Sequence, residues 1–286
     1  MRIVEAAGVR LGVRERGPED GAPFFFWHAL GPVGSGEQIA ELAPELTAAG
    51  FRVVAVDGPG FGASELLEPD GYRLPLLADL VAALLDRLGH RRVVFAGHSW
   101  GGAIAVRFAA SYPDRVRALV LLDSGHIDYV DQPDVDASRT AAEWIELARG
   151  RQASWESRDA FELDVRESAA RFTPELLEGF LAGLREEEDG RLVGASAEAR
   201  GSAYLGLVER VSLLWPVLVE HRIPLLLFLA TQPPHGDLNR ASIERFEAAV
   251  PHAEVRWVEG AGHGIPQDAG PPLGREIADW LSAVDE

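Results

Sequence analysis

The chain has 286 residues, which permits two domains or one large α/β domain with an insertion. Its 47% hydrophobic and 25% charged residues are ordinary for a globular protein, and the length allows a core that needs neither disulfides nor a metal. The net charge of −18 disfavours nucleic acid as a partner, and the absence of cysteine and lysine excludes a cysteine nucleophile, a thiolate metal site and a lysine Schiff base.

The N-terminal residues contain no long apolar stretch, so we expect no signal peptide. No apolar run along the chain approaches the roughly 20 residues of a membrane span, so we expect no membrane segment. These features lead us to expect a soluble, cytoplasmic protein that needs no metal and no cofactor.

The first 124 residues alternate between strand and helix patterns. Short apolar or alternating runs predict strands, and apolar residues at helical spacing that stop at Gly50, Gly89 or before Pro113 predict helices. In chain order, the predicted elements are strands at 3–5, 9–15 and 24–27, a helix at 37–49, a strand at 53–56, a helix at 74–88, a strand at 93–96, a helix at 103–111 and a strand at 118–122. This alternation predicts a parallel sheet flanked by helices.

The pattern breaks after about residue 124 and resumes at about 220. The segment between has no clear strand, much helical pattern and scattered aromatic residues. A strand at 224–230, a helix at 243–250, a strand at 255–258 and a helix at 273–284 then follow. We therefore divide the chain into a core of residues 1–124 and 221–286, with a helical insertion of residues 125–220.

The pentapeptide Gly97-His98-Ser99-Trp100-Gly101 follows a predicted strand and precedes a predicted helix. This G-x-S-x-G pattern in a strand–turn–helix context is typical of a nucleophile elbow. The sharp turn holds the Ser99 hydroxyl above the carboxyl edge of the sheet, and glycines are needed on either side because side chains there would clash. Ser99 is therefore the candidate nucleophile.

A serine hydroxyl needs a base within hydrogen-bond reach. His263 lies in a glycine-rich turn that follows the last strand and precedes the last helix. In a parallel sheet this turn lies on the same edge as the elbow, so we expect His263 to be the base.

With these residues in view, the sequence resembles the α/β-hydrolase superfamily over nearly its whole length. The segment from Trp27 to Pro32 looks like the family's oxyanion loop, and the segment from Asp57 to Ser64 is similar to its D-x-P-G-x-G-x-S loop. The resemblance implies an α/β fold with a mostly parallel, eight-stranded sheet flanked by helices, and a helical cap inserted after the sixth strand. Ala29 departs from the family's usual glycine, and alanine is tolerated there only with a negative φ.

The resemblance also implies two main-chain donors for an oxyanion, the N–H groups of Leu30 and Trp100. Asp57 is interpreted as a brace for its own loop.

The position of the third, acidic residue stays open between two candidates. The loop after the seventh strand, where most of the family carries the acid, has no acidic residue until Asp237. The alternative is Asp123 at the end of the sixth strand, an arrangement similar to that of a minority of the family. We favour Asp123, because its strand lies next to the strand that leads into Ser99.

These residues predict a serine hydrolase that cleaves a carboxylic ester, thioester or lactone through an acyl-enzyme. Serine at the elbow, in place of aspartate, argues against an epoxide hydrolase of the family's usual type. The alternatives are cleavage of a carbon–carbon or amide bond, acyl transfer, or a binding protein of this fold without catalysis.

The partner we expect is a small, hydrophobic substrate, because the insertion is rich in aromatic residues. Candidate pocket residues are His28, His98, His126, Trp144 and Trp155. The sequence carries no signal for an oligomeric state.

Overall fold

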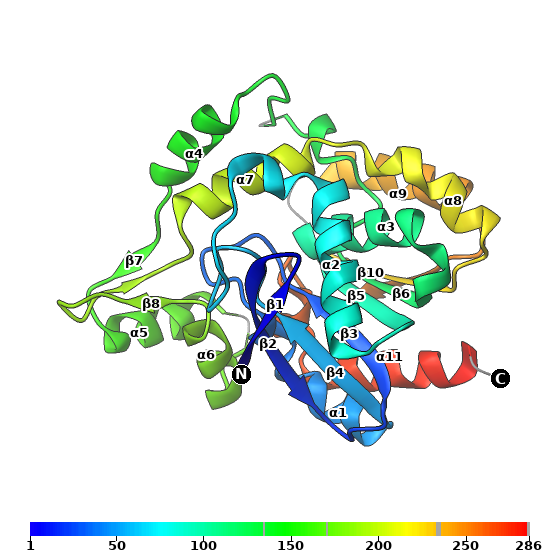
Figure 1. The fold of residues 1–286 in the computed structure, drawn as a ribbon, viewed down its shortest axis with the longest axis horizontal. Helices are drawn as coiled ribbons and strands as arrows, with labels where there is room; N and C mark the ends of the chain where they lie inside the picture. The colour runs from blue at the N-terminus through cyan, green and yellow to red at the C-terminus, as the bar shows by residue number, and fades with distance from the viewer. Residues whose placement is uncertain (134, 170, 233–235, 285–286) are drawn as a thin grey trace.

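The computed structural model describes residues 1–133, 135–169, 171–232 and 236–284, and describes only the backbone of residues 168 and 236–239. Its centre is an eight-stranded sheet with the strand order β1-β2-β4-β3-β5-β6-β10-β11. Only β1 and β2 pair antiparallel to their neighbours; the pairs from β4 to β11 are parallel. The predicted fold class is confirmed (Figure 1).

The strands follow the predicted apolar runs with small extensions at their ends. They are β1 (Arg2–Ala6), β2 (Val9–Arg16), β3 (Ala22–Trp27), β4 (Phe51–Val56), β5 (Val93–His98), β6 (Val116–Leu122), β10 (Leu225–Ala230) and β11 (Glu254–Val258). Every residue of β5 and β10 is buried, as expected for strands covered on both faces.

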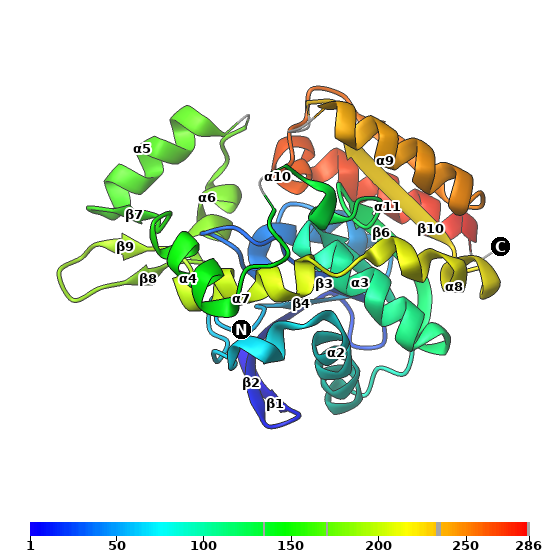
Figure 2. The same cartoon turned by 90° about the horizontal axis from the view of Figure 1, so that it is seen from above.

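Successive residues of a strand pack on opposite faces of the sheet. In β3, Phe25 and Trp27 join one apolar cluster, whereas Phe24 and Phe26 join the other. The first cluster includes residues of α2 (Leu74–Leu88), α3 (Trp100–Ser111) and α9 (Gly236–Ala249), and the second includes residues of α1 (Ala43–Ala48), α10 (Ile265–Ala269) and α11 (Pro271–Val284). The result is a three-layer arrangement in which the helices cover both faces of the sheet (Figures 1 and 2).

One predicted helix is divided in two. The expected helix at 37–49 is a 3₁₀ turn, η1 (Gly36–Ile39), followed by α1. Pro44 lies in the first turn of α1, and proline has no N–H to continue a helix that began earlier. The helix predicted at 74–88 has the predicted bounds.

The segment between β6 and β10 forms α4 (Ala141–Arg149), α5 (Arg158–Ser168), α6 (Pro174–Leu181), α7 (Ala197–Leu207) and α8 (Trp215–Glu220), with 3₁₀ turns η4 (Tyr129–Asp131) and η5 (Val211–Leu214). It also contains a small antiparallel sheet of β7 (Ser154–Trp155), β9 (Leu192–Val193) and β8 (Arg185–Glu186). The expectation of no strand here was wrong, because strands of two residues are too short to show a period. This sheet lies with α5 and α6 away from the central sheet (Figure 2).

Among the described residues, no single helix is long and apolar enough to cross a membrane. The bent pair Ala197–Leu207 and Val211–Glu220 meets the length and composition criteria only when the two are taken together. Residues of both, such as Ala203 and Leu218, belong to the main buried cluster of the protein.

Candidate active site

Ser99 occupies the sharp turn between β5 and α3. Its backbone has φ 54° and ψ −114°, a conformation that is costly for a residue with a side chain. A Cβ on Gly101 would lie 2.1 Å from the Trp27 carbonyl oxygen, and one on Gly97 would lie 2.3 Å from the Gly101 oxygen. The two glycines of the motif are therefore required by close backbone contacts, as predicted.

The Ser99 side chain is directed away from the helix that it precedes. Serine at an N-cap usually accepts a hydrogen bond from the first turn, but Ser99 makes no such bond. Its Oγ lies 2.8 Å from Nε2 of His263, in the loop after β11. The two residues that the sequence placed on one edge of the sheet are thus in hydrogen-bond contact.

Asp123 lies at the end of β6 with a positive φ of 49°. Its Oδ2 is 2.7 Å from Nδ1 of His263, and its Oδ1 accepts the N–H of Ala230 at 3.1 Å. Burial raises the pKa of Asp123, but the hydrogen bonds from His263 and Ala230 outweigh burial and hold the pKa below its ordinary value. Asp123 is therefore an ionised carboxylate that faces the imidazole.

The structure does not describe the side chain of the other candidate acid, Asp237. Its backbone lies at the start of α9. Of the two candidates, Asp123 is the one that the structure places against His263.

The loop that carries His263 is held by a second histidine. His98 is 3% exposed, and its Nε2–H donates to the His263 carbonyl oxygen at 2.7 Å. Burial lowers the pKa of His98 to about 3, so the ring is neutral at physiological pH. This contact fixes the backbone of the base, and a contribution of His98 to a pocket stays a prediction.

The amide of Leu30 in the oxyanion loop has no hydrogen-bond acceptor among the described residues. The N–H of Ala29 donates to Gln38 Oε1 at 2.9 Å, and that of Gly31 donates to the Ala29 carbonyl at 3.1 Å. Within the described part of the protein, the Leu30 N–H between them has no hydrogen-bond acceptor. The φ of Ala29 is not positive, so its backbone adopts a conformation that alanine tolerates, as the sequence required.

The second amide belongs to Trp100, the first residue of α3. The first amides of a helix have no acceptor within it, and the helix dipole makes this end positive. The Gly101 N–H donates to the His28 carbonyl at 3.2 Å, which ties the start of α3 to the oxyanion loop. The two amides predicted as oxyanion donors therefore lie on the oxyanion loop and on the start of α3, which are joined by this hydrogen bond.

His28 braces the oxyanion loop against the loop after β4. Its Nδ1–H donates to the Ala29 carbonyl at 2.8 Å, and its Nε2 accepts the Gly58 N–H at 2.8 Å. Burial lowers the pKa of His28 to about 4, so it remains neutral in this role. A role for His28 in lining a pocket stays a prediction.

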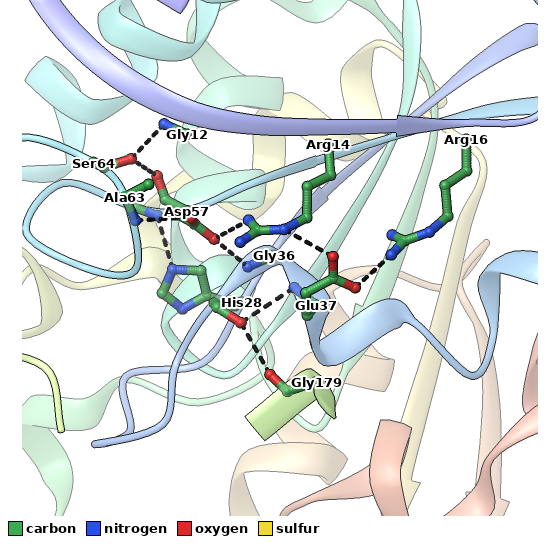
Figure 3. Close-up of polar contacts among 12 residues, drawn as sticks. Gly12, Arg14, Arg16, His28, Gly36, Glu37, Asp57, Ala63, Ser64 and Gly179 are labelled. Atoms are coloured by element: carbon green, nitrogen blue, oxygen red, sulfur yellow. Dashed lines mark hydrogen bonds and ion pairs between the residues drawn. The ribbon is translucent and has the colours of Figure 1, made fainter. Parts of the chain in front are cut away.

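Asp57 organises the loop after β4, as the sequence suggested. This carboxylate is fully buried and pairs with Nη1 of Arg14 at 2.6 Å (Figure 3). It also accepts the N–H groups of Gly36 and Ala63, at 2.8 and 3.0 Å. The contacts of Asp57 are structural, and they join strand β2, turn η1 and the loop into one unit.

Tyr129 is a site residue that the sequence reasoning missed. Its hydroxyl lies 3.3 Å from Ser99 Oγ. Because Ser99 donates its own proton to His263, Tyr129 is the donor in this contact. Burial raises the pKa of Tyr129 to about 12, so the phenol keeps its proton at neutral pH. Its position six residues after Asp123 was the only sequence signal for this role.

A buried ion pair fixes the segment that carries Tyr129. Asp128 is fully buried and accepts both the N–H and the hydroxyl of Ser212, at 2.9 and 2.6 Å. It also pairs with Arg210 at 3.3 Å. These contacts anchor the start of η4, and with it the backbone next to Tyr129, to η5.

The remaining predicted pocket residues lie in three different surroundings. His126 is 2% exposed, and neither ring nitrogen has a hydrogen-bond partner among the described residues. Trp144 is buried and stacks on Tyr204, with ring centroids 4.5 Å apart. Trp155 belongs to the small sheet, where its indole N–H donates to Asp164 at 2.9 Å. Their contribution to a pocket stays a prediction.

No three histidine, aspartate or glutamate residues gather as metal ligands in the part of the chain that the structure describes.

Residues 22–266 match the family model described as the alpha/beta hydrolase fold. The chain therefore belongs to the α/β-hydrolase family, as its fold and motifs indicated.

Individual relatives match shorter stretches of the chain. A 2-hydroxy-6-oxononadienedioate/2-hydroxy-6-oxononatrienedioate hydrolase of Burkholderia vietnamiensis is 48% identical over 77 residues, which cover 27% of each protein. Bifunctional epoxide hydrolase 2 of Mus musculus is 40% identical over 96 residues, 33% of this chain and 17% of that protein. The chain thus spans well under half the length of these curated relatives.

Among solved structures, E-2-(acetamidomethylene)succinate hydrolase superposes with a TM-score of 0.77. The two chains are 22% identical, and the alignment covers 98% of each. This likeness shows the shared fold over nearly the whole chain.

The lowered pKa of Asp123 predicts a pH-dependent contribution to stability. An ionised group with a depressed folded-state pKa stabilises the protein fully above its unfolded pKa of about 4, and this contribution is lost as the pH falls through the folded pKa. We compare the free energies of unfolding of the wild type and Asp123→Asn. The contribution of the ionised Asp123 should be constant above about pH 5. Below about pH 4 the wild type should lose stability relative to the variant. Urea denaturation of both proteins across this range measures it. A difference that moves in favour of the wild type on acidification would contradict the assignment.

Proposed function

We propose that the protein is a serine hydrolase that cleaves a carboxylic ester, thioester or lactone through an acyl-enzyme on Ser99. One observation carries the proposal: a single imidazole, His263, contacts the Ser99 hydroxyl through Nε2 and the Asp123 carboxylate through Nδ1. This is the arrangement in which a histidine can accept a proton from serine while a carboxylate stabilises the imidazolium.

In acylation, Ser99 Oγ attacks the substrate carbonyl carbon, and its proton passes to His263 Nε2. Asp123 keeps the Nδ1 proton in place and stabilises the positive ring that forms. The tetrahedral intermediate then collapses, the bond to the leaving oxygen or sulfur breaks, and His263 gives its proton to that atom. The acyl group remains on Ser99.

The negative charge on the carbonyl oxygen develops close to the elbow, where the amides of Leu30 and Trp100 are the proposed donors. Two properties support them: the Leu30 N–H lacks another acceptor within the described residues, and the Trp100 N–H lies at the positive end of α3. Loss of one oxyanion donor typically costs about 3–4 kcal/mol of transition-state stabilisation.

In deacylation, His263 takes a proton from water, and the hydroxide attacks the acyl carbon. Ser99 Oγ is now the leaving atom and recovers its proton from His263. Tyr129 donates to this same oxygen, so it stabilises the negative charge that develops on Oγ as the acyl bond breaks. The products are a carboxylic acid and the free enzyme.

The expected substrate is a small molecule with an apolar acyl or alcohol part. The aromatic content of the segment between β6 and β10, including the Trp144–Tyr204 stack, supports an apolar lining. Cleavage of a carbon–carbon or amide bond, or acyl transfer, is the alternative for the same site, since these reactions also begin with attack on a carbonyl. The name of the Burkholderia relative points to a keto-dicarboxylate as the test substrate for that alternative.

The identity of the acid is tested by kinetics on a series of chromogenic esters of increasing acyl length. We expect Asp123→Asn to lower kcat/KM by about 10⁴, because the amide favours the wrong tautomer of His263. Asp237→Asn is the matched control and should stay within about threefold of the wild type, because the proposed mechanism gives the Asp237 carboxylate no role. Ser99→Ala gives the background rate.

Two outcomes would overturn the assignment. Near-normal kinetics in Asp123→Asn together with an inactive Asp237→Asn would transfer the role to Asp237. Ester hydrolysis that survives in Ser99→Ala would show that the reaction occurs elsewhere. Circular dichroism of each variant checks that the fold is intact.

The contact between Tyr129 and Ser99 predicts a selective effect on deacylation. We expect Tyr129→Phe to lower kcat by about tenfold, the value of one hydrogen bond to a charged atom, while kcat/KM changes less than about threefold. A larger burst of chromogenic product in the first turnover would show that the acyl-enzyme accumulates. Tyr112→Phe is the control, because its hydroxyl donates to Asp79 on an exposed surface. Equal losses in kcat and kcat/KM would contradict a role at the leaving oxygen.

A further inference from the structure

A polar cleft lies at the amino-terminal edge of the sheet, opposite the edge that carries Ser99. It is lined by the three turns that lead into β5, β6 and β10, at residues 91–92, 113–116 and 221–224. These strands are neighbours in the sheet, so turns far apart in the sequence meet in one place. The cavity has a volume of about 470 Å³, large enough for a small organic molecule.

The cleft is strongly basic in a protein of net charge −18. Four arginines line it, Arg91, Arg92, Arg115 and Arg222, against a single acidic residue, Asp114. Arg115 pairs with Asp86, but within the described ranges no carboxylate forms an ion pair with the other three. At physiological ionic strength, charges beyond about 8 Å are screened, so the local arginines dominate the potential in the cleft.

Two of the arginines are positioned by neutral carbonyl groups, which do not cancel the charge of a guanidinium. Arg92 Nε donates to the Val116 carbonyl at 3.2 Å. Arg115 Nε donates to the Arg91 carbonyl at 2.6 Å and so joins two of the turns. Burial, and to a lesser extent the nearby charge of Arg92, lower the pKa of Arg117 on β6.

Arg222 occupies a backbone position that favours glycine. It follows the C-cap of α8 and has a φ of +48°, in the left-handed region. An arginine at this point adds a third positive charge to the lining of the cleft, beside those of Arg91 and Arg92 on the turn before β5.

We propose that this cleft binds a small phosphate-bearing anion. The planar guanidinium group donates two parallel hydrogen bonds to phosphate oxygens, so several arginines without ion-pair partners around one cavity suit a multiply charged phosphate group. The apolar walls formed by Pro113, Ile223 and Pro224 leave room for the organic part of a phosphate ester. Because the cleft and the Ser99 site lie at opposite ends of the strands, binding here does not depend on the proposed hydrolase activity.

Isothermal titration at about 0.15 M ionic strength tests the proposal, with inorganic triphosphate and adenosine triphosphate as probes. We expect saturable 1:1 binding to the wild type and to Ser99→Ala. The triple variant Arg91→Gln, Arg92→Gln, Arg222→Gln should raise Kd by at least about tenfold, since loss of one charged contact alone has this size. The charge-matched control Arg151→Gln, Arg185→Gln, Arg240→Gln changes three exposed arginines that do not line the cleft and should leave Kd within about twofold.

Each outcome decides the question. Equal affinity for the two probes supports a site for the phosphate group alone, and tighter adenosine triphosphate binding supports a site for a phosphate ester. The absence of saturable binding would overturn the proposal. Equal weakening in the triple variant and its control would also overturn it, because the effect would then be one of overall charge.

Discussion

The proposed chemistry of this protein depends on one hydrogen bond, between Ser99 Oγ and His263 Nε2, which joins residues 164 positions apart. Neither residue reaches the other without the parallel sheet, which ends β5, β6, β10 and β11 at the same edge. The bond also requires a strained backbone, since the positive φ of Ser99 turns its hydroxyl away from α3 and toward the imidazole. The protein sustains that strain through close contacts of Gly97 and Gly101.

Supporting contacts then hold each partner of this bond separately. His98 fixes the carbonyl of His263, Ala230 orients the carboxylate of Asp123, and Gln38 holds the oxyanion loop. Both His98 and His28 are kept neutral by burial, so these positions do not change charge near neutral pH. In the proposed mechanism, these supporting contacts leave the side chains of Ser99, His263 and Tyr129 free to exchange protons or hydrogen bonds with a substrate. The Leu30 and Trp100 amides are the proposed main-chain donors to it.

Features that depend on residues close together in the sequence could be predicted from it, whereas features that depend on contacts between distant residues could not. Helix α2 could be predicted because its apolar residues recur at helical spacing within one short segment. The elbow could be predicted because its serine and its two glycines lie within five consecutive residues. Tyr129 could not be predicted, because its position depends on Asp128 contacting Ser212, 84 residues away. The small sheet of β7, β8 and β9 was missed because its strands are too short to show a period, and because β7 pairs with a strand far along the chain. The preference for Asp123 came from strand adjacency, and the structure places that residue against His263.

The central claim is that Ser99 is a nucleophile activated by His263, and covalent labelling tests it most directly. A fluorophosphonate loses fluoride when an activated serine attacks phosphorus, and peptide mapping by mass spectrometry identifies the modified residue. The account predicts a single adduct on Ser99, formed about 10³-fold or more slowly in His263→Ala. An unmodified Ser99 in the folded wild type, or the same labelling rate in His263→Ala, would contradict it.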